Sequence, residues 1–212
     1  MVLLEEEYLS ILIKNKQIFT NDVPASHLVY NELTRSMKEY PCGITTDEYL
    51  DLVDKNDKII GRKPRSAIYQ ERLSNFRVVN AFVVNSKGQL WIPQRSHDKK
   101  KFPGALDFSM GGHVESGESY DIAFKRETLE ELRIDIAAIN YRLLGKLSPK
   151  RDRVASFMQV YEILMEQTPK YNPDDFINSY WLYSHELQAM IKNGKPAKSD
   201  LIVVTNRFYK DR

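Results

Sequence analysis

The stretch that decides the fold spans residues 112–134 and reads GHVESGESYDIAFKRETLEELRI. A glycine-containing turn comes first, followed by a helix-forming segment that carries Arg126, Glu127, Glu130 and Glu131. Residues three and four apart share a helix face, so Glu127 lies beside both other glutamates. Each like-charge pair costs about 0.2–0.5 kcal/mol when nothing neutralises it. A hard divalent cation, which prefers oxygen ligands, would reverse the sign of that interaction.

The helix is predicted to run from about Tyr120 to Leu132. Ser119 is a favourable N-cap, Asp121 places negative charge in the first turn, and neither proline nor glycine interrupts the segment before Arg133. The segment is therefore predicted to form one uninterrupted helix.

The two faces of this helix are expected to differ. At 100° per residue, Ile122, Leu129 and Leu132 fall on one side, which is predicted to pack against the protein. The three glutamates and Ala123 fall on the opposite side. Most charge runs are only a solvated helix face, and the acids alone would favour that interpretation.

The spacing of the charged residues favours a more specific interpretation. Gly112 is followed after five residues by Glu118, after seven more by Arg126-Glu127, and after two more by Glu130-Glu131. This pattern resembles the Nudix box, G-x5-E-x7-R-E-U-x-E-E-x-G-U, in which U is aliphatic.

Two positions depart from the box. Thr128 stands where an aliphatic residue is usual, and Arg133 replaces the glycine that would end the helix in a left-handed conformation. Because arginine at positive φ costs about 1 kcal/mol, the helix is expected to end differently here.

The resemblance extends from about Asp47 to the C-terminus and is closest to the isopentenyl-diphosphate-isomerase-like branch of the family. Residues 47–61 are predicted to form a hairpin with its turn at Asn56-Asp57, and residues 76–96 two strands joined at 86–88. The resemblance implies an α/β fold, an α/β/α sandwich with a mixed sheet, over residues 46–212. Residues 1–45 are predicted to form a helical N-terminal extension.

The same branch contains isomerases, which move a double bond and have a cysteine just before the Gly-His pair. Here Ser109-Met110-Gly111 precedes Gly112-His113, so that cysteine is missing. The chain has four histidines, and Asn75-Phe76-Arg77 supplies none where isomerases have one. A hydrolase is therefore favoured over an isomerase, and a non-catalytic nucleotide-binding protein remains an alternative.

The resemblance implies water attack on a phosphoric anhydride of a nucleoside di- or triphosphate or related derivative, assisted by Mg²⁺ or Mn²⁺. By the same resemblance Glu127 and Glu131 are the leading metal ligands and Glu130 a third. A backbone carbonyl of Gly111 or Gly112 is the fourth. Glu127 is the first choice for general base.

Arg126 cannot act as a base because its guanidinium stays protonated, but its planar fork is suited to orienting a glutamate, with Glu118 a plausible partner. His113 is more plausibly a hydrogen-bonded structural residue than a ligand. Many relatives place another carboxylate before a tryptophan, where this chain has Tyr180 before Trp181. The possible substitutes are Asp174, Asp175 and Glu162.

Anionic substrates require positive charge near the acids. Arg95 and Lys101 precede the box, and Arg151 lies before the apolar strand predicted in residues 154–164. Phe102 is a candidate for stacking on a base, although core packing is equally compatible with it. We take these four residues as candidate substrate contacts, while noting that lysine runs are usually solvated surface.

Composition indicates a small intracellular enzyme. With 31 basic and 29 acidic residues, the net charge of +2 gives no case for a nucleic-acid partner. No apolar stretch approaches the length of about 18 residues typical of a membrane span, and the acidic start is unlike a signal peptide, so the cytoplasm is expected. Cys42 is the single cysteine and supports no internal disulfide.

The ends of the chain are predicted to be helical. Two short helices are expected in the N-terminal extension, and their apolar sides pack on the catalytic core or form a homodimer contact. Near the C-terminus, Ser184 is expected to cap a helix that ends at Asn193-Gly194, and a last helix is expected from Asp200 to Tyr209.

Overall fold

The computed structural model describes residues 47–210. The predicted N-terminal helices, their possible dimer contact and Cys42 lie outside the described residues, so the extension and its boundary remain predictions.

The described chain opens with the predicted hairpin. Strands β1 (Tyr49–Val53) and β2 (Ile59–Pro64) pair in an antiparallel arrangement. The Asp54 carboxylate accepts hydrogen bonds from the backbone N–H groups of Asn56 and Lys58, which stabilises the turn. Asp57 adopts the left-handed conformation that such a turn requires.

The main sheet has six strands and is mixed, as predicted. Its order is β6-β7-β3-β4-β8, with β5 also paired to β3. The β3–β7 pairing is parallel and the other pairings are antiparallel. The strands are β3 (Arg77–Val84), β4 (Leu90–Arg95), β5 (Met110–His113), β6 (Asn140–Leu147), β7 (Phe157–Leu164) and β8 (Phe176–Leu182).

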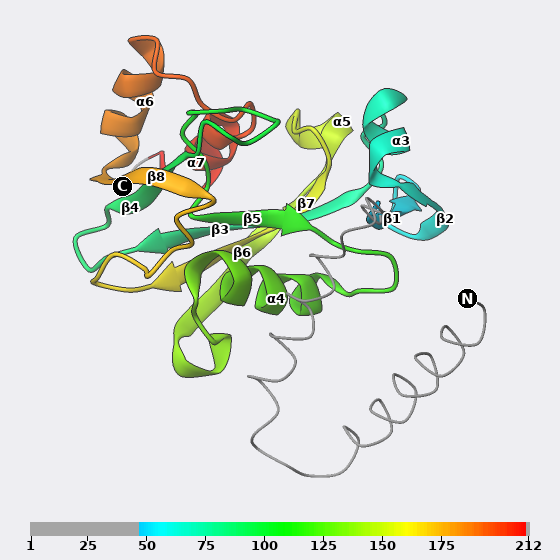
Figure 1. The fold of residues 1–212 in the computed structure, drawn as a ribbon, viewed down its shortest axis with the longest axis horizontal. Coiled ribbons are helices and arrows are strands. Elements are labelled where there is room, and N and C mark those ends of the chain that lie inside the picture. The colour runs from blue at the N-terminus through cyan, green and yellow to red at the C-terminus, as the bar shows by residue number, and fades with distance from the viewer. Residues whose placement is uncertain (1–46, 211–212) are drawn as a thin grey trace, which may run out of the picture. The chain divides into compact units, whose positions relative to one another are not determined.

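Helices cover both faces of this sheet (Figure 1). On one face, α4 (Tyr120–Leu132) packs Ala123 and Phe124 against a buried cluster. On the other, α6 (Ser184–Lys192) and α7 (Leu201–Tyr209) contribute to a second cluster around Phe82. Alternate residues of β3 point into the two clusters, which gives the predicted α/β/α sandwich.

The remaining helical segments are short: α3 (Arg65–Gln70), η1 (Ile136–Ala138) and α5 (Pro149–Asp152). The last helix was predicted one residue too long, since Asp200 is its N-cap. Ser184 is likewise the first residue of α6 and not its cap. Tyr183 is the N-cap, and its backbone N–H donates to Glu186. Within residues 47–210, no helix has the length and apolarity needed to cross a membrane.

The predicted bounds of α4 are confirmed, with Ser119 accepting a hydrogen bond from Ile122 N–H, but the predicted faces were partly wrong. The side chain of Ile122 is 56% exposed, whereas Ala123 and Thr128 are fully buried. The buried arc is set by the sheet, against which the Phe124 ring stacks on Tyr161 at 4.0 Å between centroids. The small side chain of Ala123 allows α4 to lie close to the sheet.

The two departures from the box are absorbed locally. Thr128 donates its hydroxyl hydrogen to the Phe124 carbonyl, so its polar atom is satisfied inside the core. Arg133 adopts φ 57°, ψ 34°, and its N–H donates to the Leu129 carbonyl. The helix therefore ends in the left-handed manner typical of glycine, and the prediction of a different ending was wrong.

Candidate active site

The site forms along the edge of β5. β4 and β5 share one edge of β3: β5 pairs with Val78 to Ala81, and β4 pairs with Val83 and Val84. In the part of the chain that the structure describes, β5 has no other strand partner. Its second edge is therefore available to side chains.

The backbone of Gly111 faces this outer edge. Its N–H donates to Glu131 Oε2 at 3.0 Å, and two residues later the His113 carbonyl accepts from Arg126 Nη2 at 3.0 Å. In an antiparallel pair, the N–H and C=O of one residue point the same way and alternate along the strand. The Gly111 carbonyl therefore points outward, whereas that of Gly112 points to β3. Of the two alternative carbonyls expected from the sequence, the strand geometry favours Gly111 as the candidate ligand.

Both glycines are required by close approaches. A Cβ on Gly112 would lie 1.9 Å from Cδ of Glu127. A Cβ on Gly111 would lie 2.6 Å from Asn80 Oδ1 and 3.4 Å from Lys198 Nζ. Absent side chains on β5 thus let Glu127 lie directly on the strand.

Glu127 and Glu131 are poorly solvated carboxylates. Burial raises the pKa of Glu127 to about 7, although Arg126 opposes the shift. Burial and the neighbouring Glu127 raise the pKa of Glu131 well above its ordinary value, while the Gly111 N–H lowers it. These two acids lie within electrostatic reach of one another at the outer edge of β5.

Arg126 connects the parts of the site. Its guanidinium donates to both carboxylate oxygens of Glu118 at 2.9 Å, to Glu127 Oε1 at 2.7 Å and to the His113 carbonyl. Burial alone would raise the pKa of Glu118, but hydrogen bonds from Arg126 and from Glu115 N–H hold that pKa below its usual range. Glu118 is therefore an ionised anchor for Arg126 at neutral pH.

The other candidate acids are less well placed. The Glu130 side chain is 51% exposed and lies 3.7 Å from Arg126. Asp175 contributes to the raised pKa of Glu131 and forms an ion pair with Lys99. Glu162 is buried elsewhere, where it contacts Arg142 and Tyr209.

His113 is held as a neutral ring. Burial, followed by the charges of nearby cations, lowers its pKa to about 3. Its Nε2 lies 2.8 Å from the Tyr69 hydroxyl, and its ring stacks on Phe76. These contacts agree with the structural role favoured from the sequence.

Ser109, near the position of the missing isomerase cysteine, is fully buried. Its hydroxyl accepts a hydrogen bond from Val83 N–H and donates to the Trp91 carbonyl. Both interactions fix the sheet, so this hydroxyl faces neither the carboxylates nor solvent.

The candidate substrate residues divide into two groups. Arg95 lies 2.6 Å from Asp107, and its Nε donates to the Lys101 carbonyl. The Lys101 ammonium lies over the Tyr69 ring, beside the site. Phe102 is exposed in the same loop.

Arg151 belongs to the second group. It is exposed on α5, where it contacts Asp152 and the Lys146 carbonyl. Its described contacts are thus with α5 itself and with the end of β6, and none connects it to the box.

Two cations near the site were not expected from the sequence. Lys198 approaches Gly111 from the segment between α6 and α7, and Arg65 at the start of α3 contacts Glu48. Neither residue lies in the box or in the basic stretches that were singled out from the sequence. Only the pairing of distant segments brings them to β5.

The donor set is compatible with a hard divalent cation. Among residues 47–210, no three Asp, Glu, His or Cys side chains already form a metal-binding group. Nevertheless, Glu127, Glu131 and the outward Gly111 carbonyl bring oxygen donors to one short edge, and both carboxylates have raised pKa values. A cation there would supply the neutralisation that the protein leaves incomplete.

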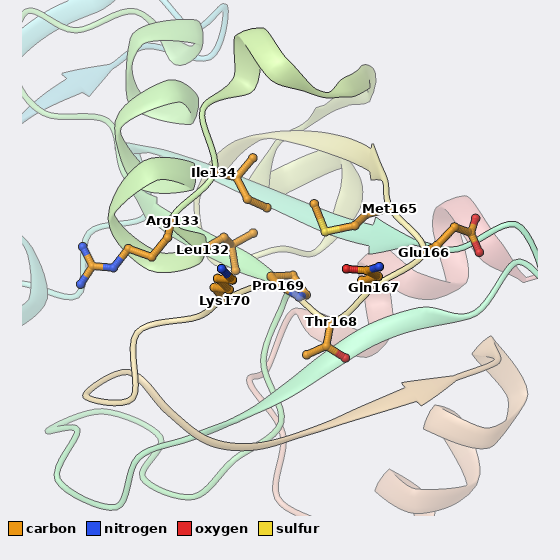
Figure 2. A pocket seen from close by; sticks show the side chains of 9 residues that line it. All are labelled: Leu132, Arg133, Ile134, Met165, Glu166, Gln167, Thr168, Pro169 and Lys170. Carbon is orange, nitrogen blue, oxygen red and sulfur yellow. The ribbon is translucent and has the colours of Figure 1, made fainter. Parts of the chain in front are cut away.

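A separate hollow of about 420 Å³ lies beyond the end of α4. It is lined by residues 132–134 and 165–170, and Figure 2 shows Arg133 directed away from the other lining side chains. None of the box glutamates lines it. We therefore take the edge of β5, and not this hollow, as the candidate active site.

Comparisons with known proteins identify the family of this chain. A family model described as the NUDIX domain matches residues 74–202. An uncharacterised Nudix hydrolase of Nostoc sp. is 56% identical over 162 residues, covering 76% of this chain and 96% of the relative. A Nudix hydrolase of Deinococcus radiodurans is 46% identical over 171 residues, covering 80% of this chain and 98% of the relative.

A crystal structure of a protein from Deinococcus radiodurans has the same fold. It matches with a TM-score of 0.72 at 46% identity, covering 76% of this chain and 99% of the other. Nudix proteins generally use a divalent cation and bind small nucleotide-derived molecules. The box, the sandwich and these relatives agree, and the chain belongs to the Nudix family as one of its hydrolases.

Proposed function

We propose that this protein hydrolyses a phosphoric anhydride bond in a nucleoside di- or triphosphate, or in another nucleoside diphosphate derivative, with Mg²⁺ or Mn²⁺ in the cytoplasm. The observation that carries the proposal is the pair of poorly solvated carboxylates, Glu127 and Glu131, at the outer edge of β5. The divalent cation that accompanies an anionic substrate would neutralise this otherwise unfavourable pair.

Glu127, Glu131 and the Gly111 carbonyl would hold the cation, with the exposed Glu130 as an additional carboxylate. The cation would neutralise phosphate oxygens and lower the pKa of a bound water. Arg126 fixes the Glu127 carboxylate through Oε1 and leaves its second oxygen for the site. Glu118 in turn fixes Arg126.

Glu127 is our candidate for the general base. Arg126 holds only Oε1 of this carboxylate, so the second oxygen is available to accept a proton from water. Lys101 is the better placed of the predicted substrate contacts, because the Arg95 guanidinium is already engaged by Asp107.

Isomerase chemistry is disfavoured by two contacts. The Ser109 hydroxyl is used by the backbone of β3 and β4, and the imidazole of His113 is used by Tyr69. The Ser109 hydroxyl is therefore not free for proton transfer to carbon, and Nε2 of His113 is already engaged.

The proposal is tested with purified protein, Mg²⁺ or Mn²⁺, and a panel of nucleoside diphosphates, triphosphates, nucleotide sugars and dinucleoside polyphosphates, scored by product. Glu127→Gln and Glu131→Gln should each lower kcat by about two orders of magnitude or more, as expected for loss of a metal-binding carboxylate. Glu71→Gln is the matched control, because Glu71 pairs with Lys63 on the surface.

Absence of turnover with every substrate would contradict the hydrolase assignment for this panel. If both glutamine variants also left nucleotide binding unchanged, the proposed site would be wrong. An allylic diphosphate formed from isopentenyl diphosphate would instead support the isomerase alternative.

A further inference from the structure

Charges of opposite sign lie on the two faces of β5. Successive residues of a strand direct their Cβ positions to opposite faces. At Gly112 that position meets Glu127, and at the adjacent Gly111 it meets Asn80 and Lys198 Nζ. Glu127 and Lys198 therefore approach the same two glycines from opposite faces.

The backbone fixes Lys198 in this place. Leu106 N–H donates to the Pro196 carbonyl at 2.8 Å, and Lys198 N–H donates to the Leu106 carbonyl at 2.8 Å. The segment before α7 is thus joined to the strand-like segment that leads into β5. Lys198 is positioned by pairing of main chains and not by a flexible surface loop alone.

The charge of Lys198 is incompletely neutralised. Its Nζ lies 3.3 Å from Asp107 Oδ1, while Asp107 Oδ2 lies 2.6 Å from Arg95. The Asp107 side chain is 4% exposed, and it faces two cations with a single negative charge. One positive charge therefore remains in surplus, and the Lys198 side chain is still 28% exposed.

Lys101 adds a second cation to this face. Its ammonium lies over the ring of Tyr69, whose hydroxyl contacts His113. Burial, and then the nearby charge of Arg65, lower the pKa of Lys101 to about 8. His113 is two residues from Gly111, so its side chain shares the face of β5 that Lys198 approaches. Both lysines contribute to the lowered pKa of this ring.

Arg65 is a third cation near these lysines. Its positive charge contributes less, because its guanidinium pairs with Glu48 at 2.9 Å. The three cations come from separate segments: the start of α3, the loop between β4 and β5, and the segment between α6 and α7. Their convergence beside an anhydride-cleaving site calls for an anionic ligand group.

We propose that Lys198 and Lys101 form an anion-binding subsite that receives a phosphate group of the substrate on the face of β5 opposite Glu127. This inference rests on the proposed function for the identity of the substrate, but not for the binding of an anion. The phosphate held by the lysines would be one that the carboxylate-bound cation does not neutralise.

A purely structural role is the competing explanation for Lys198, since its ammonium also neutralises buried Asp107. A structural role predicts that Lys198→Gln lowers the thermal midpoint while the folded protein binds anions as before. A binding role predicts weaker anion binding by protein that remains folded. The two explanations are separated by measuring both quantities.

The probe is inorganic diphosphate, titrated calorimetrically into the protein in EDTA so that no metal bridges it to the carboxylates. Lys198→Gln should weaken binding by about tenfold, as expected for loss of one charge-assisted contact. Lys198→Arg should stay within about threefold of wild type because it keeps the charge. Lys195→Gln is the control, since Lys195 contacts Gln94 and the Tyr180 ring instead.

Lys101→Gln provides a second variant that leaves the Asp107 ion pairs intact. It should also weaken diphosphate binding by about tenfold. If folded Lys198→Gln bound diphosphate as wild type does, or if Lys198→Gln did not fold and Lys101→Gln bound normally, the subsite would be disproved.

Kinetics then separate this inference from the proposed function. With a hydrolysed nucleotide, Lys198→Gln should raise KM by about tenfold while kcat changes less. Lysine-dependent diphosphate binding without turnover of any nucleotide would support the subsite and contradict the hydrolase proposal. Turnover that depends on the glutamates, with a KM that Lys198→Gln leaves unchanged, would support the hydrolase proposal and contradict the subsite.

Discussion

At the scale of single residues, the site depends on how one guanidinium distributes its donors. Arg126 contacts Glu118, Glu127 and the His113 carbonyl at the same time. The Glu127 carboxylate is proposed to bind metal. Through Arg126 it is linked both to the loop before α4 and to the end of β5. A positive charge alone would not reproduce these three directions.

Replacing Arg126 with lysine tests this geometric role. The ammonium keeps the charge but cannot span the three acceptors, so we expect kcat and apparent Mn²⁺ affinity to fall by about 10–100-fold. Steady-state kinetics across a Mn²⁺ titration measure both effects. Lys125→Gln, a change at an exposed neighbouring position, should leave kcat and Mn²⁺ affinity unaltered. If the two variants behaved alike, the geometric role of the Arg126 guanidinium would be contradicted.

At the scale of elements, β5 works because it lacks side chains at two successive positions. Gly112 admits Glu127 from the side of α4, and Gly111 admits Lys198 from the other side. The strand is short, but its pairing with β3 fixes the positions of both approaches.

Gly112→Ala is predicted to displace Glu127, because the new methyl group would occupy the place of its carboxylate. We expect turnover to fall by about 100-fold or more, the size of effect that misplacement of a reacting group produces. Gly61→Ala is the matched control, with no heavy atom within 4 Å of its Cβ position. Activity retained by Gly112→Ala and a crystal structure with Glu127 unmoved would refute the requirement.

Local signals explain which elements the sequence predicted well. Ser119 and the lack of helix breakers define the bounds of α4, and Asn56-Asp57 defines the first turn, because each effect acts within a few residues. The buried face of α4 was mistaken at Ile122 and Ala123, since burial depends on where the sheet lies and not on periodicity alone.

Non-local contacts explain what the sequence did not reveal about the site. Lys198 reaches Gly111 only because Leu106 and Ala197 form a parallel bridge between distant segments. The outward direction of the Gly111 carbonyl depends on strand pairing in the same way. The carboxylates were found from their spacing, whereas no spacing rule connects them to Lys198.

At the scale of the whole molecule, the site makes stability depend on pH and on metal. The pKa of Glu127 rises on folding from an ordinary value of 4.5 to about 7. Between those pH values the native state binds more protons than the unfolded chain. The free energy of unfolding of metal-free protein therefore falls as pH rises through this range.

Glu127→Gln removes that titration. At pH 8 without metal, we expect the variant to exceed wild type in stability by up to roughly 3 kcal/mol, with the difference vanishing near pH 4. Urea unfolding at the two pH values measures it. Mn²⁺ should raise the thermal midpoint of wild type more than that of the variant. A stability difference that does not depend on pH would contradict this explanation.

The outer edge of β5, which pairs with no further strand among the described residues, also bears on self-association. An unpaired strand edge is a template on which another chain can add a strand, and two glycines offer no side chain to block it. Glu131 occupies the N–H of Gly111, and Arg126 occupies the carbonyl of His113. The same two side chains that organise the site thus also prevent this edge from nucleating intermolecular β-sheet.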